Sequence, residues 1–221
     1  MNPRTPLLPR VAISLILAAI ILPACEWRGL RGNGVITTEN RTVEKFVNIE
    51  ASGAYEIEWS SGPPAVSITT DQNLLGHVTT KVSGDKLKIH SDKHLAPSKG
   101  IKVNISSEML SGAQFSGAVR FHATKLSGPN FYLDTSGAAK ITLDGHVNGL
   151  TASMTGASKL LASSLRTQTT ELSVTGAGDA EVWVTDTLTV AILGAGKVTY
   201  SGNPRTVKKN ISGAGKIQRR D

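Results

Sequence analysis

Cations at one repeated position are the residues in this chain most suited to binding chemistry. The third residue after each of six regularly spaced glycines is charged, and the six are Arg120, Lys140, Lys159, Asp179, Lys197 and Lys216. If the repeats stack in register, the five cations would form a stripe that attracts an acidic polymer such as an acidic glycan or lipopolysaccharide. The same column also suits a solvated face that protects a β protein from aggregation, and both interpretations stay open.

Side chains that could act on a sugar are few. Asp179 and Glu181 are two residues apart and would share the outward face of a strand, where they could serve as an acid and base pair. No neighbouring repeat offers a second carboxylate in the same columns. Trp59, Tyr132 and Trp183 could stack on sugar rings or simply cover the core. We therefore expect no catalytic residues and no enzymatic activity, with a polysaccharide-active enzyme on a β-helix scaffold as the alternative.

No metal site or cofactor is expected. The segment Thr175-Gly176-Ala177-Gly178-Asp179 faintly resembles a calcium-binding turn, but the other repeats carry Lys or Arg where this one has Asp179. His90 and His94 are the only close pair among the five histidines, and outside a helix their spacing does not direct both rings to one metal.

The elements that would position these residues follow from a repeat of about nineteen residues. Separations of 18 to 20 residues connect six glycines, each followed by Ala: Gly117, Gly137, Gly156, Gly176, Gly194 and Gly213. Apolar residues dominate two positions before and four positions after each glycine, which is the alternation of strands with one buried face. A near-fixed period of this length is typical of solenoids. The sequence thus predicts an all-β, single-chain β-solenoid or β-helix whose coils contain two or three short strands.

The corner of each predicted coil lies at the Gly-Ala pair. Glycine supplies the unusual backbone dihedral, and the adjacent alanine is expected to pack closely between successive coils. The N-terminal half is also β but not visibly periodic, although Ser52-Gly53-Ala54 repeats the marker. Strands are expected over residues 42–49, 55–60, 65–70, 77–82, 86–90 and 101–105. We interpret this half as a β cap that closes the solenoid core.

The N-terminus has the features of an export signal. Arg4 and Arg10 precede an apolar run from Val11 to Leu22, which is too short for a stable membrane span. The run ends at Leu22-Pro23-Ala24-Cys25, which resembles the lipobox of bacterial lipoproteins. Cys25 is the only cysteine, so it cannot form a disulfide within the chain, and lipidation explains it better. Glu26 follows it, and the resemblance to sorted lipoproteins implies an outer-membrane location.

Three segments follow from these observations. Residues 1–24 are expected to be a lipoprotein signal peptide, residues 25–34 a lipidated tether, and residues 35–221 the β-solenoid domain. The formal charge of +7 falls to +5 without the first segment, which holds two arginines and no acid. This modest excess favours anionic partners where the charge is clustered. The membrane is an expected partner through the lipid, nucleic acid is not, and the oligomeric state stays open.

The motifs of the folded part resemble one bacterial family. They are Gly32-Asn33-Gly34-Val35, Phe46-Val47-Asn48-Ile49-Glu50, Ser52-Gly53-Ala54, Asn73-Leu74-Leu75, the serial Gly-Ala pairs and Ser201-Gly202-Asn203-Pro204. Together they look like the head-GIN domain of auto-transporter adhesin heads, over residues 32–219. The resemblance implies a β-solenoid and an adhesin-like, non-enzymatic binding or scaffolding lipoprotein anchored in the cell envelope.

Overall fold

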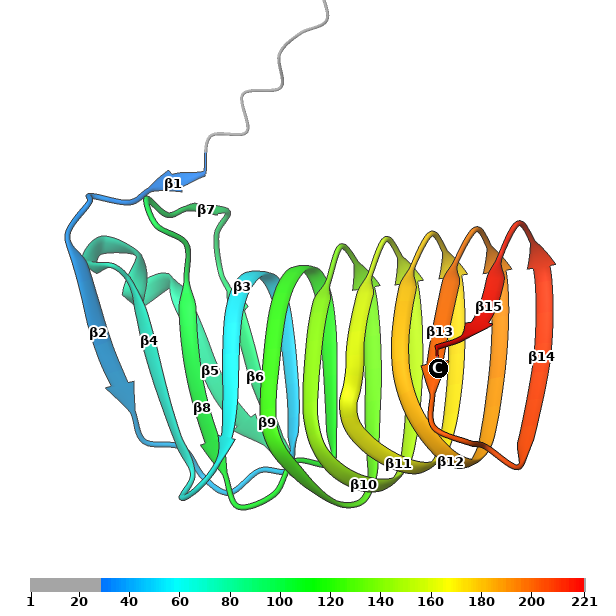
Figure 1. Ribbon diagram of the computed structural model, residues 1–221. Helices are drawn as coiled ribbons and strands as arrows, with labels where there is room; N and C mark the ends of the chain where they lie inside the picture. The colour runs from blue at the N-terminus through cyan, green and yellow to red at the C-terminus, as the bar shows by residue number, and fades with distance from the viewer. Residues whose placement is uncertain (1–28, 221) are drawn as a thin grey trace, which may run out of the picture.

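The protein is a β-solenoid of about five turns with a β cap at its N-terminal end, as the all-β prediction requires (Figure 1). The computed structural model describes residues 29–220, so the expected signal peptide and Cys25 lie outside the described residues. Within this range no helix is long and apolar enough to cross a membrane.

Most coils of the solenoid are one long curved strand, in place of the two or three short strands expected, whereas the last coil is divided into short strands. The strands are β9 (Gly112–Gly137), β10 (Lys140–Gly156), β11 (Lys159–Gly176), β12 (Asp179–Gly194), β13 (Lys197–Ser201), β14 (Thr206–Gly213) and β15 (Lys216–Arg219). Successive coils pair in parallel. Each long strand also bends at a second place, away from the Gly-Ala corner. The register shifts there, as between Thr142 and Asp144, because a β-bulge bends a strand without ending it.

The marker glycines form a ridge along one corner of the solenoid. Gly156 pairs with Gly176, and Gly176 pairs with Gly194, in the same register as the rest of the row. Gly176 has φ +111°, and a Cβ added there would lie 2.7 Å from the carbonyl oxygen of Gly156. The next amide, that of Ala177, donates a 3.0 Å hydrogen bond to this same oxygen. Only glycine fits a position that combines a positive φ with so close an approach.

The alanines that follow these glycines are exposed, so the expectation that they pack between coils is wrong. The strand alternation continues through the corner, and it directs the residue one position after glycine outward. The buried corner residue is the next one, such as Ala139 after Ala138 or Gly178 after Ala177. The apolar columns two before and four after glycine do line the core, including Phe115 and Phe121 with ring centroids 4.8 Å apart.

The N-terminal half contains the first coil and the strands that cap it, in keeping with the predicted β cap. Its strands are β2 (Ile36–Arg41), β3 (Asn48–Ser61), β4 (Ala65–Asp71), β5 (Val78–Ser83), β6 (Lys86–Ser91) and β8 (Lys102–Ser107), with a short 3₁₀ helix η1 (Gln72–His77). Strand β3 is the first coil, because it pairs in parallel with β9 and places Gly53 opposite Gly117. The strand expected at 42–49 is confirmed only at residues 48–49, where β3 begins, because residues 42–47 form no strand. The edge strand β2, which the sequence did not predict, is almost wholly polar and lacks an apolar alternation.

Part of the expected tether is attached to the cap. Strand β1 (Leu30–Arg31) pairs with β7 (Leu95–Ala96). The carboxylate of Asp71 is buried and accepts hydrogen bonds from the Gly34 amide at 2.7 Å, the Ser98 amide at 2.8 Å and the Ser98 hydroxyl at 2.7 Å. Burial raises the pKa of Asp71, but these hydrogen bonds outweigh it, so the pKa lies below its ordinary value. Asp71 thereby joins residues 29–34 to the cap.

Charged residues close both ends of the sheet. At the cap end, Arg41 pairs with buried Val66 and donates hydrogen bonds to the carbonyls of Leu75 and Val78. At the other end, Lys209 of β14 pairs with Val190, which belongs to a buried column of the core. Inward positions occupied by charges stop a sheet from adding further strands.

Candidate anion-binding site

The five predicted cations lie in a single row on the outside of the solenoid. Arg120 pairs with Lys140, Lys140 with Lys159, Lys159 with Asp179, Asp179 with Lys197, and Lys197 with Lys216. All six side chains are exposed, and neighbouring strands of a sheet lie about 4.8 Å apart. We call Arg120, Lys140, Lys159, Lys197 and Lys216 the basic ladder. Its alignment is the one that the glycine period predicted.

The row continues into the cap, which the sequence reasoning missed. Glu56 pairs with Arg120, and Lys102 pairs with Glu56 from its other side. Glu56 lies three positions after Gly53, so the same offset could have found it. Lys102 carries no such signal, because strand β8 has no Gly-Ala marker.

The ladder cations are not neutralised by neighbouring carboxylates. Among residues 29–220, no ion pair within 4.0 Å joins any of the five to an acid, Asp179 and Glu56 included. Arg120, Lys140 and Lys159 are consecutive in the row, with no acid between them. Adjacent like charges at strand spacing repel by roughly 1 kcal/mol even in water. An anion bound across the row would relieve that repulsion.

The three consecutive cations also border a hollow. Its volume is about 560 Å³, and Lys99 of the cap contributes a fourth cation to its wall. The exposed alanines of the ridge, including Ala118, Ala138 and Ala157, form an apolar part of the lining. A ligand in this hollow would meet these cations, the carboxylate of Glu56 and the methyl groups of the alanines.

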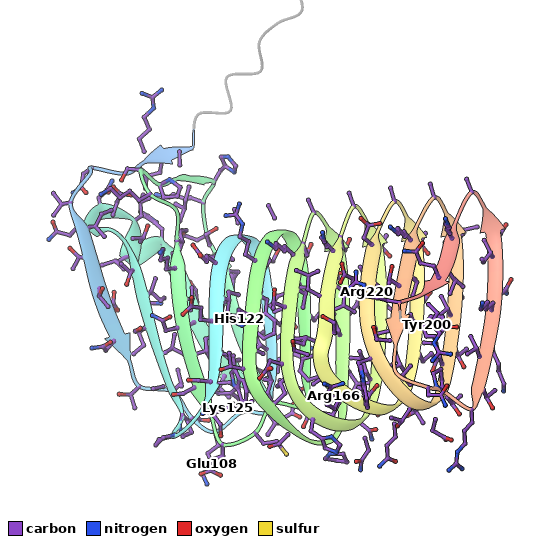
Figure 2. All side chains as sticks on the ribbon, in the orientation of Figure 1. Glu108, His122, Lys125, Arg166, Tyr200 and Arg220 are labelled. Atoms are coloured by element: carbon purple, nitrogen blue, oxygen red, sulfur yellow. The ribbon has the colours of Figure 1, made fainter. Side chains whose placement is uncertain are left out.

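The residues considered for catalysis and metal binding are not assembled into a site. Glu181 accepts a 2.9 Å hydrogen bond from Arg220, one of the residues labelled in Figure 2. Asp179 has lysines as both of its row neighbours, and the row neighbours of Glu181 are Leu161 and Thr199. Within residues 29–220, no three His, Cys, Asp or Glu side chains are grouped to hold a metal ion.

The aromatic candidates differ in where they lie. Trp59 is buried and donates its indole N–H to Ser107 at 2.9 Å. Trp183 is half-buried beneath the guanidinium of Arg166, which lies 4.2 Å from the ring centroid, a cation–π distance. Tyr132 is exposed, but it lies five positions before Gly137, whereas the ladder residues follow the marker glycines. It is therefore on a different part of the coil from the ladder.

Several solved structures share the fold of this chain. A "putative adhesin" from Bacteroides fragilis superposes with a TM-score of 0.71 at 20% identity, covering 87% of this chain and all of that one. A "putative lipid binding protein" from Parabacteroides distasonis gives 0.57 at 20% identity, covering 87% and 99%. A "putative adhesin" from Parabacteroides merdae gives 0.51 at 20% identity, with the same coverage. At this identity the likeness concerns the fold.

No curated protein matches the sequence. A family model does match, over residues 45–204, which leaves out β1 and β2 at one end and β14 and β15 at the other. Its range lies within residues 32–219, where the motifs were recognised. The chain belongs to the family described as "Putative auto-transporter adhesin, head GIN domain".

Proposed function

We propose that the protein is a non-enzymatic binding lipoprotein of the cell envelope that holds an acidic polymer, an acidic glycan or lipopolysaccharide, along its basic ladder. The observation that carries this proposal is the row of Arg120, Lys140 and Lys159, which are adjacent, exposed and without ion pairs within the described residues. A linear polyanion would meet one cation at each coil.

The proposal of a lipid anchor depends on the sequence around Cys25. The adhesin description of the family supports a location in the cell envelope. Residues 29–34 are attached to the cap, so only residues 25–28 would separate the lipid from the folded domain. Four residues reach at most about 14 Å. The cap would then lie next to the membrane.

The non-enzymatic role is supported by the acids near the ladder. Asp179 and Glu181 are the pair that could perform acid and base chemistry, and the carboxylate of Glu181 is bound by Arg220. A carboxylate engaged by a guanidinium in this way is not free to contact a substrate.

The experiment that tests this function is a binding panel on the purified protein. It should contain lipopolysaccharide, heparin and polygalacturonate, together with the uncharged glycan dextran as a control. Binding to at least one acidic polymer, weakened in the Lys140→Gln/Lys159→Gln variant, is expected. Failure of every acidic polymer to bind would overturn the proposal.

A further inference from the structure

A second hollow lies beside the ladder on the cap side of the same face. Its volume is about 860 Å³. Five polar residues cross it in one row, because the strand register pairs Asn40 with Ser67, Ser67 with Asn104, Asn104 with Glu58, and Glu58 with His122. We call these five residues the polar trough. Figure 2 labels His122, which lies toward the cap end of the solenoid.

The trough residues are exposed or half-buried, and their hydrogen-bonding groups are largely unused. Within residues 29–220, the one side-chain hydrogen bond in the row is a long contact of 3.4 Å from the Asn104 amide to the Ser67 hydroxyl. Neither Glu58 nor His122 has an ion pair in that part of the chain. The row thus presents amide, hydroxyl, carboxylate and imidazole groups outward.

Three polar side chains that border the trough are by contrast bonded inside the fold. Trp59 donates to Ser107, the Ser106 hydroxyl donates to the carbonyl of Pro63, and the Arg41 guanidinium donates to carbonyls behind β4. The outward row is therefore separate from the interactions that hold the cap together.

The trough is continuous with the basic ladder. A smaller hollow of about 220 Å³ lies between them and shares Glu58 and His122 with the trough and Arg120 and Lys140 with the ladder. A polymer that lies along the ladder can extend across this hollow without leaving the surface.

We propose that the polar trough binds the hydroxyl groups of a carbohydrate, so that the acidic polymer of this protein is a glycan. The inference rests on the proposed function, to which it adds a ligand class. A lysine attracts any anion, whereas a planar amide or carboxylate offers paired donors or acceptors that match neighbouring hydroxyl groups. A polyanion without hydroxyl groups would bind through the ladder alone and gain no affinity from the trough.

The test compares polygalacturonate, which carries hydroxyl groups and carboxylates, with inorganic polyphosphate, which has no sugar. The variant is Asn40→Ala/Asn104→Ala, two exposed substitutions that leave the charge unchanged. The expected result is a loss of about tenfold in affinity for polygalacturonate, as two hydrogen bonds of ordinary strength imply, with polyphosphate affinity unchanged. The control Asn203→Ala/Asn210→Ala removes two exposed asparagines outside the trough and should alter neither.

An equal loss of affinity for both polymers, or no loss for either, would overturn the proposal that the trough binds a carbohydrate. Neither result would contradict binding along the ladder. Binding of polygalacturonate that responds to Asn40→Ala/Asn104→Ala but not to Lys140→Gln/Lys159→Gln would support the trough and overturn the proposed function. If the wild-type protein binds neither polymer, the trough proposal is overturned, and the proposed function is decided by lipopolysaccharide and heparin in the binding panel.

Discussion

Lys140 and Lys159 are direct partners on neighbouring coils, and neither forms an ion pair with an acid in residues 29–220. The relationship follows from two separate features of the chain. The glycine ridge fixes the register of the coils, and the alternation of each strand directs the third residue after glycine outward. A cation at that position in successive coils becomes a ladder without any further contact.

The ridge predicts opposite outcomes for two adjacent residues. Gly176→Ala should destabilise the fold by at least about 1–2 kcal/mol, because its positive φ disfavours any side chain and the new Cβ would meet the Gly156 carbonyl. Ala177→Leu should change stability by less than about 0.5 kcal/mol, because Ala177 is exposed. Urea unfolding of both variants measures the difference. Equal destabilisation by the two would show that the alanine is packed between coils.

Asp71 predicts a dependence of stability on pH. Its pKa in the folded protein lies below the value of about 3.9 in an unfolded chain, so ionised Asp71 stabilises the fold. This contribution is fully present above about pH 4 and is lost as the pH falls through the folded pKa. Asp71→Asn should lower the urea midpoint at neutral pH, and its deficit from wild type should shrink in acid. A deficit that stays constant with pH would contradict the charged interaction.

Lys209 predicts a role in ending the solenoid. Lys209→Val would continue the apolar column of Leu172 and Val190 to the exposed edge of the last coil. We expect the variant to self-associate in sedimentation velocity at concentrations where wild type does not. Lys208→Val makes the same chemical change at the outward neighbour, which pairs with Thr189, and should associate less. Identical sedimentation of both variants and wild type would contradict this role.

Cys25 predicts a lipid anchor. The Cys25→Ser protein, expressed in a bacterium that processes lipoproteins, should remain uncleaved or become soluble, because the serine cannot take the place of the thiol. Fractionation and labelling with radioactive palmitate measure this outcome. Palmitate incorporated equally into wild type and Cys25→Ser would contradict lipidation at this residue.

Much of the fold and the ladder could be predicted from the sequence because both depend on a repeat. A glycine with a unique backbone requirement, such as Gly176, recurs in each coil and sets the alignment, so Lys140 and Lys159 could be paired without a structure. The polar trough could not be predicted. Asn40 and Asn104 lie in one row because each pairs with Ser67 of β4 in an antiparallel arrangement. No sequence period relates the two asparagines.

Two differences between the sequence expectations and the structure have identifiable causes. Its small size favours an interior place for Ala177, although the alternation that buries Val174 and Ala180 directs it outward. The polar sequence of residues 25–34 is typical of a tether, yet the Gly34 amide donates a hydrogen bond to Asp71, a residue 37 positions away. Contacts between segments so distant in the chain leave no pattern in either one.

The measurement that tests the central claim most directly is the salt dependence of polymer binding. Polygalacturonate should be titrated at two salt concentrations into wild type, Lys140→Gln/Lys159→Gln and Asp179→Lys. Affinity should fall steeply with salt, and loss of the two lysines should weaken binding by up to about tenfold and flatten the salt dependence. Asp179→Lys joins the two halves of the ladder and should strengthen binding. The control Lys81→Gln/Lys88→Gln removes a directly paired, exposed lysine couple on β5 and β6 and should bind like wild type. An affinity that does not change with salt concentration would contradict the ladder as the binding site. So would a loss of affinity in the Lys81→Gln/Lys88→Gln control as large as that in Lys140→Gln/Lys159→Gln.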